Sequence, residues 1–193
     1  MTETETETES ETESETESEP TRARPALPRP VLPLPTETDE RASLCRFLDD
    51  QRAVLERKCA GLTAEQLRTP AVPPSGLTLL GLVRHAAEVE RSWFRNVLGG
   101  QATTTRWPGP RPGEFAEFDV AGADPDEAFA AWREECAHAR ELAAAAPSLD
   151  MTGTARGTTY SLRYVLTHMI EEYARHNGHA DLLRERIDGE TGE

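Results

Sequence analysis

Apolar residues recur every three or four positions in four separate segments of the chain, which is the period of an amphipathic helix. The segments are residues 39–60, 77–98, 124–146, and a last one that begins near 159 or 161 and reaches 187. Gly61, Pro147 and Gly189 follow as stop signals, and Asp124-Pro125 suits a helix start. No run alternates convincingly between apolar and polar residues, so we expect no sheet. The pattern predicts an all-α fold, a four-helix bundle.

The second and third helices are joined by residues 99–123, a long irregular connection rich in Pro, Gly and Thr. A chain of this length can cross the whole bundle, whereas a short loop would make the two helices antiparallel. The connection therefore favours an up-down-down-up arrangement. The alternative is that it folds into a lid.

Composition separates the N-terminal part from the predicted bundle. Residues 1–20 are an acidic Thr-Glu and Ser-Glu repeat with nine Glu and no Lys or Arg, and we expect them to be disordered. Such a tail is either a solubilising or interaction segment or a passive solvated one. Residues 21–37 hold five Pro and predict an extended linker. The bundle is expected over 38–189, with a C-terminal tail at 190–193.

The net charge of −14 argues against nucleic acid as a partner, because binding to phosphates draws on Lys and Arg. It also argues against binding at a membrane surface. No apolar run is long enough to span a membrane, and no secretory signal precedes the bundle. The three cysteines form no disulfide framework. We therefore expect a cytoplasmic protein.

The fourth helix carries two polar residues on its apolar side. Leu162, Val165, Met169, Tyr173, Ala180, Leu183 and Ile187 define that side on a helical wheel. Glu172 and His176 fall within it, one turn apart, and His168 and His179 lie at its edge. A carboxylate on a core face is costly unless it is paired or binds a metal.

The second helix offers His85 at the border of its own apolar face. Facing helices of a bundle bring inward groups together at a shared depth. His85, Glu172 and His176 would then form a three-ligand site with an open position, suited to Zn²⁺, with Ni²⁺ or Fe²⁺ as alternatives. The competing interpretation is a buried ion pair between Glu172 and His176, because this spacing is not specific.

Other polar residues leave alternatives open. Glu90 lies near the apolar face of the second helix, where it either pairs with an Arg or acts near the metal. Arg84, Arg91 and Arg175 are candidates to hold a substrate carboxylate, and nothing in the sequence selects one. His138 is expected at the surface.

Residues 73–94, 124–140 and 161–189 resemble the DinB-like superfamily. The most similar branch has members without an assigned activity and is related to mycothiol-dependent maleylpyruvate isomerase. The resemblance covers about Asp39 to Gly189 and is most specific in EYARHNGHADLLRE. It implies an up-down-down-up four-helix bundle and a divalent metal, with His85, Glu172 and His176 at the ligand positions. Many relatives use three His, and the isomerase relatives use His, Glu and His.

The characterised relatives use low-molecular-weight thiols such as mycothiol. The resemblance therefore implies a metal-dependent thiol transferase or isomerase acting on a small electrophile, with the metal activating the thiol or water. His179 stands where many relatives have Gln; it, His168 and Glu90 are candidates to support a ligand or face the substrate. One alternative is a non-catalytic metal-binding or small-molecule-binding bundle with a stress-related role. The other is a structural or interaction protein that forms a homodimer through an exposed helix face.

Overall fold

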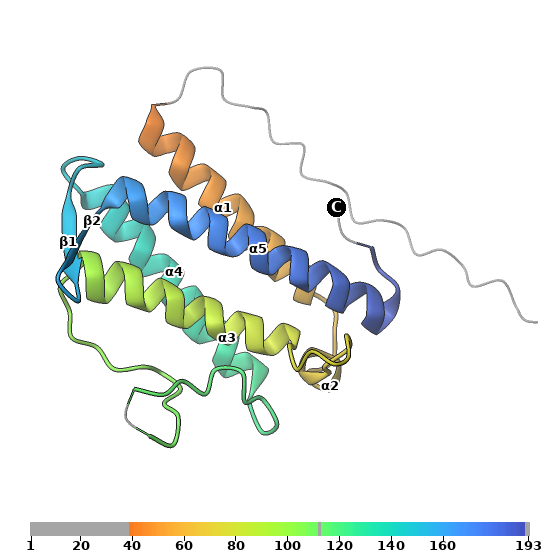
Figure 1. The fold of residues 1–193 in the computed structure, drawn as a ribbon. Helices are drawn as coiled ribbons and strands as arrows, with labels where there is room; N and C mark the ends of the chain where they lie inside the picture. Colours follow the sequence, from red (N-terminus) through yellow and green to blue (C-terminus); the bar gives the residue numbers. More distant parts are fainter. Residues whose placement is uncertain (1–38, 112, 192–193) are drawn as a thin grey trace, which may run out of the picture. The chain divides into compact units, whose positions relative to one another are not determined.

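The computed structural model describes residues 39–111 and 113–191. In this part of the chain the long helices are α1 (Glu40–Cys59), α3 (Leu79–Glu90), α4 (Pro125–Ala145) and α5 (Leu162–Asp188). Figure 1 shows them side by side, with α1 beside α5. The expected mainly helical fold is confirmed. The predicted acidic tail and Pro-rich linker lie outside the described residues.

The helices begin and end at residues with a defined capping role. The side chains of Asp39, Thr78, Asp124 and Ser161 accept backbone N–H bonds at the starts of α1, α3, α4 and α5. These bonds satisfy donors that have no partner within a helix. Helix α5 ends at Gly189, whose φ of +79° is a left-handed cap that a side chain would strain. The local sequence thus fixes where each helix starts and stops.

The predicted second helix has two parts in the structure. α3 continues into η1 (Arg91–Leu98), which is wound as a π-helix. The Gly99 amide, for example, donates to the Phe94 carbonyl five residues earlier, at 2.9 Å. A π-helical stretch changes the direction of every side chain after it, and such stretches are common near functional sites. A further short helix, α2 (Ala64–Arg68), has a Thr63–Gln66 capping box that the hydrophobic period did not reveal.

The expectation of no sheet is wrong for the described residues. β1 (Thr152–Ala155) and β2 (Thr158–Ser161) form an antiparallel hairpin directly before α5. Arg156 and Gly157 both have positive φ, as a two-residue hairpin turn requires. The strands are short and rich in Thr, so they carry no alternation that marks a buried face. Gly153 is required there, because a Cβ would lie 1.9 Å from the Val97 carbonyl oxygen of η1.

The core is apolar and is formed by all of the long helices. α1 packs most extensively against α5, and α3 packs against α4. The largest fully buried apolar side chains come from α1, α3, η1 and α5: Leu48, Leu55, Leu79, Leu80, Leu82, Phe94, Leu162, Leu166, Met169 and Leu183. The buried apolar residues of α4 are mostly small, with Trp132 as the large one. Among the described residues, every helix is too short or too polar to cross a membrane.

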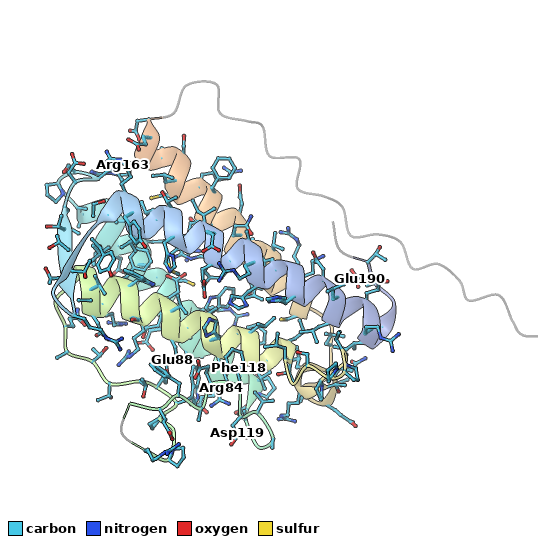
Figure 2. The ribbon with its side chains drawn as sticks, viewed as in Figure 1. Arg84, Glu88, Phe118, Asp119, Arg163 and Glu190 are labelled. Atoms are coloured by element: carbon cyan, nitrogen blue, oxygen red, sulfur yellow. The ribbon has the colours of Figure 1, made fainter. Side chains whose placement is uncertain are left out.

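The connection between η1 and α4 is fixed to α3 by backbone contacts. Glu88 Oε1 accepts the amides of Arg106 and Trp107 at 2.6 and 2.9 Å. The Arg84 guanidinium donates to the Asp119 carbonyl and lies over the Trp107 ring. Figure 2 shows Arg84 and Glu88 next to Phe118 and Asp119 of this connection. The connection therefore lies along α3, near the residues predicted to bind metal.

Candidate metal centre

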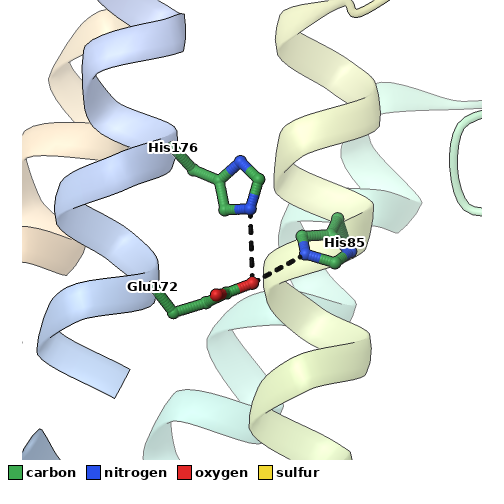
Figure 3. Close-up of side chains that lie close together, drawn as sticks. All are labelled: His85, Glu172 and His176. Carbon is green, nitrogen blue, oxygen red and sulfur yellow. Dashed lines mark hydrogen bonds and ion pairs between the residues drawn. The ribbon is translucent and has the colours of Figure 1, made fainter. Parts of the chain in front are cut away.

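His85, Glu172 and His176 lie together at the seam between α3 and α5 (Figure 3). Glu172 Oε1 is 3.1 Å from His85 Nε2 and 3.3 Å from His176 Nε2. One potential ligand atom from each residue lies within 4.8 Å of the other two. We call these three residues the metal cluster. Glu172 and His176 are in register because they lie four residues apart on α5.

The donor set fits a divalent metal in both chemistry and spacing. Two imidazole nitrogens and one carboxylate oxygen are the ligand types of catalytic zinc. Bonds of about 2.0–2.2 Å in a tetrahedron place neighbouring ligand atoms about 3.3–3.6 Å apart. The two spacings at Glu172 Oε1, 3.1 and 3.3 Å, are close to that range. The side chains of His85, Glu172 and His176 are 21%, 16% and 19% exposed, so solvent reaches all of them.

The electrostatics of the metal cluster favour the protonation states that bind metal. Burial disfavours ionised Glu172, but the His85 hydrogen bond and the nearby charge of His176 outweigh it and lower the pKa of the carboxyl. Burial lowers the pKa of His176, and the neighbouring His85 lowers it further. A carboxylate and a neutral imidazole are the forms that coordinate metals.

The outward-facing nitrogens of the two histidines have different partners. His85 Nδ1 is 3.4 Å from Glu117 Oε1, and the Phe118 ring stacks on the imidazole at 5.2 Å. His176 Nδ1 is 3.4 Å from His179 Nδ1. His179 therefore contacts a residue of the metal cluster, and its supporting role at a metal stays a prediction. Glu117 and Phe118 could not be predicted from the sequence, because they belong to the irregular connection. No hydrophobic period there shows which side chains face the helices.

His168 lies one turn before Glu172 but outside the metal cluster. Its ring contacts Trp93 at 4.9 Å and stacks parallel to Tyr164 at 6.0 Å. Its charge contributes to the lowered pKa of Glu172. His168 thus belongs to an aromatic group with Trp93 and Tyr164 and is not one of the three residues of the metal cluster.

Glu90 is paired with an arginine and is fully buried. Its two carboxylate oxygens each accept a bond of 2.7 Å from Arg52 of α1. The Tyr173 hydroxyl also donates to Glu90 Oε1 at 2.8 Å. Of the two interpretations of Glu90 from sequence, the structure has the arginine pair. His138, expected at the surface, is half-buried, and its ring nitrogen Nε2 is out of contact with solvent.

Among the candidate arginines, only Arg175 contacts the metal cluster. Its NH1 lies 3.9 Å from Glu172 Oε2, and its side chain is well exposed. Arg84 is engaged with the connection, and Arg91 donates to Glu135 at 2.7 Å. If an arginine of this set meets a substrate carboxylate, the geometry favours Arg175.

The protein's own thiols are poor nucleophiles. Cys59 and Cys136 are buried, and Cys45 is half-buried; none of the three is in a disulfide. Burial raises the pKa of Cys59 to about 12 and also raises the pKa values of Cys45 and Cys136. Because the thiolate is the reactive form, a sulfur nucleophile would have to come from outside the chain.

Beneath the metal cluster lies a small apolar hollow of about 10 Å³. Its wall is made by α1, α3 and α5, and its lining residues are Leu55, Leu82, His85, Ala86, Val89, Met169, Glu172, Tyr173 and His176. A volume of this size holds about one water-sized group. A substrate must therefore approach from the solvent side, where Arg175 and Phe118 are exposed.

Comparison with known proteins identifies a family match. Residues 43–189, well over half of the chain, match the family described as Mycothiol-S-transferase. Searches of the curated proteins and of the solved structures each gave no match.

Proposed function

Because this chain belongs to the mycothiol S-transferase family, we propose that it transfers a low-molecular-weight thiol, such as mycothiol, to a small electrophile at a divalent-metal site. The ligands would be His85, Glu172 and His176, whose donor atoms converge on Glu172 Oε1. This convergence is the observation that carries the proposal. Zinc suits the donor set first, with nickel or iron as alternatives.

The ligand charges suit an anionic sulfur. A bound divalent cation would lower the pKa of a thiol and so favour the thiolate at neutral pH. Two neutral imidazoles and one carboxylate would leave roughly one unit of positive charge uncompensated at such a cation. The lowered pKa values of Glu172 and His176 favour the carboxylate and the neutral imidazole at these two positions.

The solvent side of the metal cluster is where the electrophile would lie. Transfer breaks the S–H bond of the thiol and forms a carbon–sulfur bond at the electrophile. The thiol proton goes to solvent, and the electrophile's leaving group, such as halide from a haloarene, departs with the electron pair of the broken bond. Arg175, exposed beside Glu172, would attract an anionic group of the thiol or the electrophile. Isomerisation of a thiol adduct would need the same site, and the small apolar hollow beneath it would leave little room for water on the inner side of the ligands.

We also infer the finer architecture, an up-down-down-up four-helix bundle. The long connection between η1 and α4 supports it, because it has the length to return along α3. The extensive contacts of α1 with α5 and of α3 with α4 are the pairings that this arrangement requires.

Metal content and thiol-dependent activity test the proposal. We expect about one zinc per chain, from three protein ligands, in protein purified without a metal-binding tag. Glu172→Gln should lose the zinc and the mycothiol-dependent consumption of an electrophile such as a haloarene. Glu171→Gln is the matched control, because Glu171 is the preceding residue, is half-exposed and pairs with Arg175.

The outcomes separate the candidate functions. Full zinc content in Glu172→Gln would overturn the ligand assignment. Zinc without any thiol-dependent reaction, over a panel of electrophiles, would contradict transfer and leave the non-catalytic metal-binding bundle. Zinc in neither protein after reconstitution would mean that Glu172 and its histidines form only a polar cluster.

A further inference from the structure

Glu117 is a buried carboxylate in an irregular part of the chain. Its residue is 8% exposed, and its atom Oε2 is buried without a hydrogen-bond partner among the described residues. The only hydrogen bond that its side chain makes in the described part of the chain is to His85 Nδ1, at 3.4 Å. Burying a carboxylate is costly without a compensating charge. Among the described residues, the His85 ring is therefore the polar group that the Glu117 carboxylate meets at hydrogen-bond distance.

The connection holds Glu117 in place from both sides. The Ala116 amide donates to the Trp107 carbonyl at 2.9 Å, and Arg84 binds the Asp119 carbonyl. Phe118, the next residue, stacks on the same imidazole that Glu117 contacts. Gly81 of α3 permits this approach, because a Cβ there would lie 3.0 Å from the Phe118 ring. Glu117 is thus fixed at the His85 ring by its neighbours.

Each ring nitrogen of His85 faces the carboxylate of a different glutamate. Nε2 faces Glu172 Oε1 at 3.1 Å, within the metal cluster, and Nδ1 faces Glu117. When Nδ1 donates its proton to a carboxylate, Nε2 is left with the lone pair that a metal requires. A carboxylate behind a ligating histidine also raises the basicity of that ligand and fixes its ring. In contrast, His176 Nδ1 faces another imidazole, His179, so no carboxylate backs it.

We propose that Glu117 is the positioning residue of the metal site: its carboxylate accepts the His85 Nδ1 proton and holds Nε2 toward Glu172. The inference rests on the proposed function and assigns a role to the connection between η1 and α4. Glu117 is not a fourth ligand in this assignment, because it lies on the Nδ1 side of the ring, away from Glu172 and His176. The connection therefore completes a site whose ligands come only from helices.

Zinc affinity tests this assignment in three variants of the full chain. Glu117→Ala should raise the zinc dissociation constant about 10- to 100-fold, as loss of an outer carboxylate does. Glu117→Gln, which keeps an acceptor but loses the charge, should raise it less. Glu114→Gln is the matched control, because Glu114 is a partly exposed carboxylate of the same connection that pairs with Arg111. It should bind zinc like the wild type. Wild-type affinity in Glu117→Ala would overturn the proposal.

Nitrogen-15 NMR of the imidazoles gives a readout that does not depend on activity. In the zinc-loaded wild type we expect a His85 Nδ1 proton that is protected from exchange with solvent, and its loss in Glu117→Ala. An unprotected proton in the wild type would overturn the assignment. If the wild type binds no zinc, the proposed function fails; if the wild type binds zinc and Glu117→Ala binds it equally well, only the assignment of Glu117 fails. The two failures are therefore distinguishable.

Discussion

Neighbouring residues of α5 face two different polar clusters within the same group of helices. Glu172 belongs to the metal cluster, and Tyr173 belongs to a set that we call the buried network: Arg52, Glu90, Trp132, Cys136 and Tyr173. Both contain a glutamate on an otherwise apolar helix face. They differ in the counter-charge and in access to solvent.

In the buried network every strong polar group has a partner. Arg52 binds Glu90 through two bonds of 2.7 Å, Tyr173 donates to Glu90, and Trp132 Nε1 donates to the Tyr173 hydroxyl at 2.7 Å. The guanidinium of Arg52 is charged at every pH of interest, and its pKa is raised further by Glu90 despite burial. Glu90 is 0% exposed. Such a network has no position left for a ligand.

In the metal cluster the positive partner is replaced by imidazoles. His85 and His176 can give up their protons, and the permanent cation beside Glu172 is the exposed Arg175, at 3.9 Å rather than in a buried bidentate pair. All three side chains of the metal cluster reach solvent. A buried glutamate alone therefore does not identify a functional site. The two clusters differ in whether the groups around the carboxylate can lose their positive charge, so that the carboxylate becomes available to bind a metal ion.

Removal of the permanent counter-charge should give the largest effect. Arg52→Ala would leave Glu90 buried and unpaired, and we expect the free energy of unfolding in urea to fall by about 3–5 kcal/mol. Arg133→Ala is the control, because its pair with Glu56 is exposed on both sides. It should cost less than about 1 kcal/mol. If Arg52→Ala and Arg133→Ala lower the free energy of unfolding equally, the buried network does not stabilise the fold more than an exposed ion pair does.

Tyr173→Phe should have an intermediate effect on stability and none on metal. It removes a hydroxyl that serves both Trp132 and Glu90, at a cost of about 1–3 kcal/mol in unfolding free energy. The ring that lines the hollow under the metal cluster is kept, so zinc affinity should not change. Tyr164→Phe, at a half-exposed tyrosine, is the control and should stay within about 0.5 kcal/mol. A large loss of zinc affinity in Tyr173→Phe would show that the two clusters are coupled.

The smallest expected effect is a pH dependence confined to the metal cluster. The pKa of His176 in the folded protein lies below the ordinary 6.5. As the pH falls, the unfolded chain therefore takes up the His176 proton at a higher pH than the folded protein does. Metal-free protein should consequently lose stability as the pH falls below about 6.5. The lowered pKa of Glu172 adds a loss only below about 4.5. Arg52 and Tyr173, with raised pKa values, add none at neutral or mildly acidic pH.

His176→Gln tests the origin of this dependence. Its unfolding free energy should vary less between pH 5 and 6.5 than that of the wild type, when both are measured in urea without metal. An unchanged slope would assign the pH dependence to other groups.

The sequence predicted the helices well because their start and stop signals are local. Asp124, Ser161 and Gly189 cap in the structure where the hydrophobic period begins or ends. The hairpin before α5 was missed because its strands are held by pairing and by the approach of Gly153 to η1, neither of which leaves a period in the sequence.

Only the part of the site that lies on helices could be predicted from the sequence. Periodicity grouped His85, Glu172 and His176, and the structure places them together; that a metal binds them stays a prediction. Periodicity also marked Glu90 as a polar residue on an apolar face, but it could not assign Arg52 as its partner, because that contact joins α1 to α3. The position of Glu117 could not be predicted either, because it depends on how the connection folds back onto α3.

The position of Glu117 also has a consequence for how members of such a family can diverge. Connections tolerate substitution and insertion better than helices do, yet here the connection contributes both Glu117 and Phe118 to the surroundings of His85. Sequence drift in residues 99–123 would therefore change the surroundings of His85 while the three residues of the metal cluster stay on their helices. For protein engineering, this segment is the natural place to graft a new preference for an electrophile.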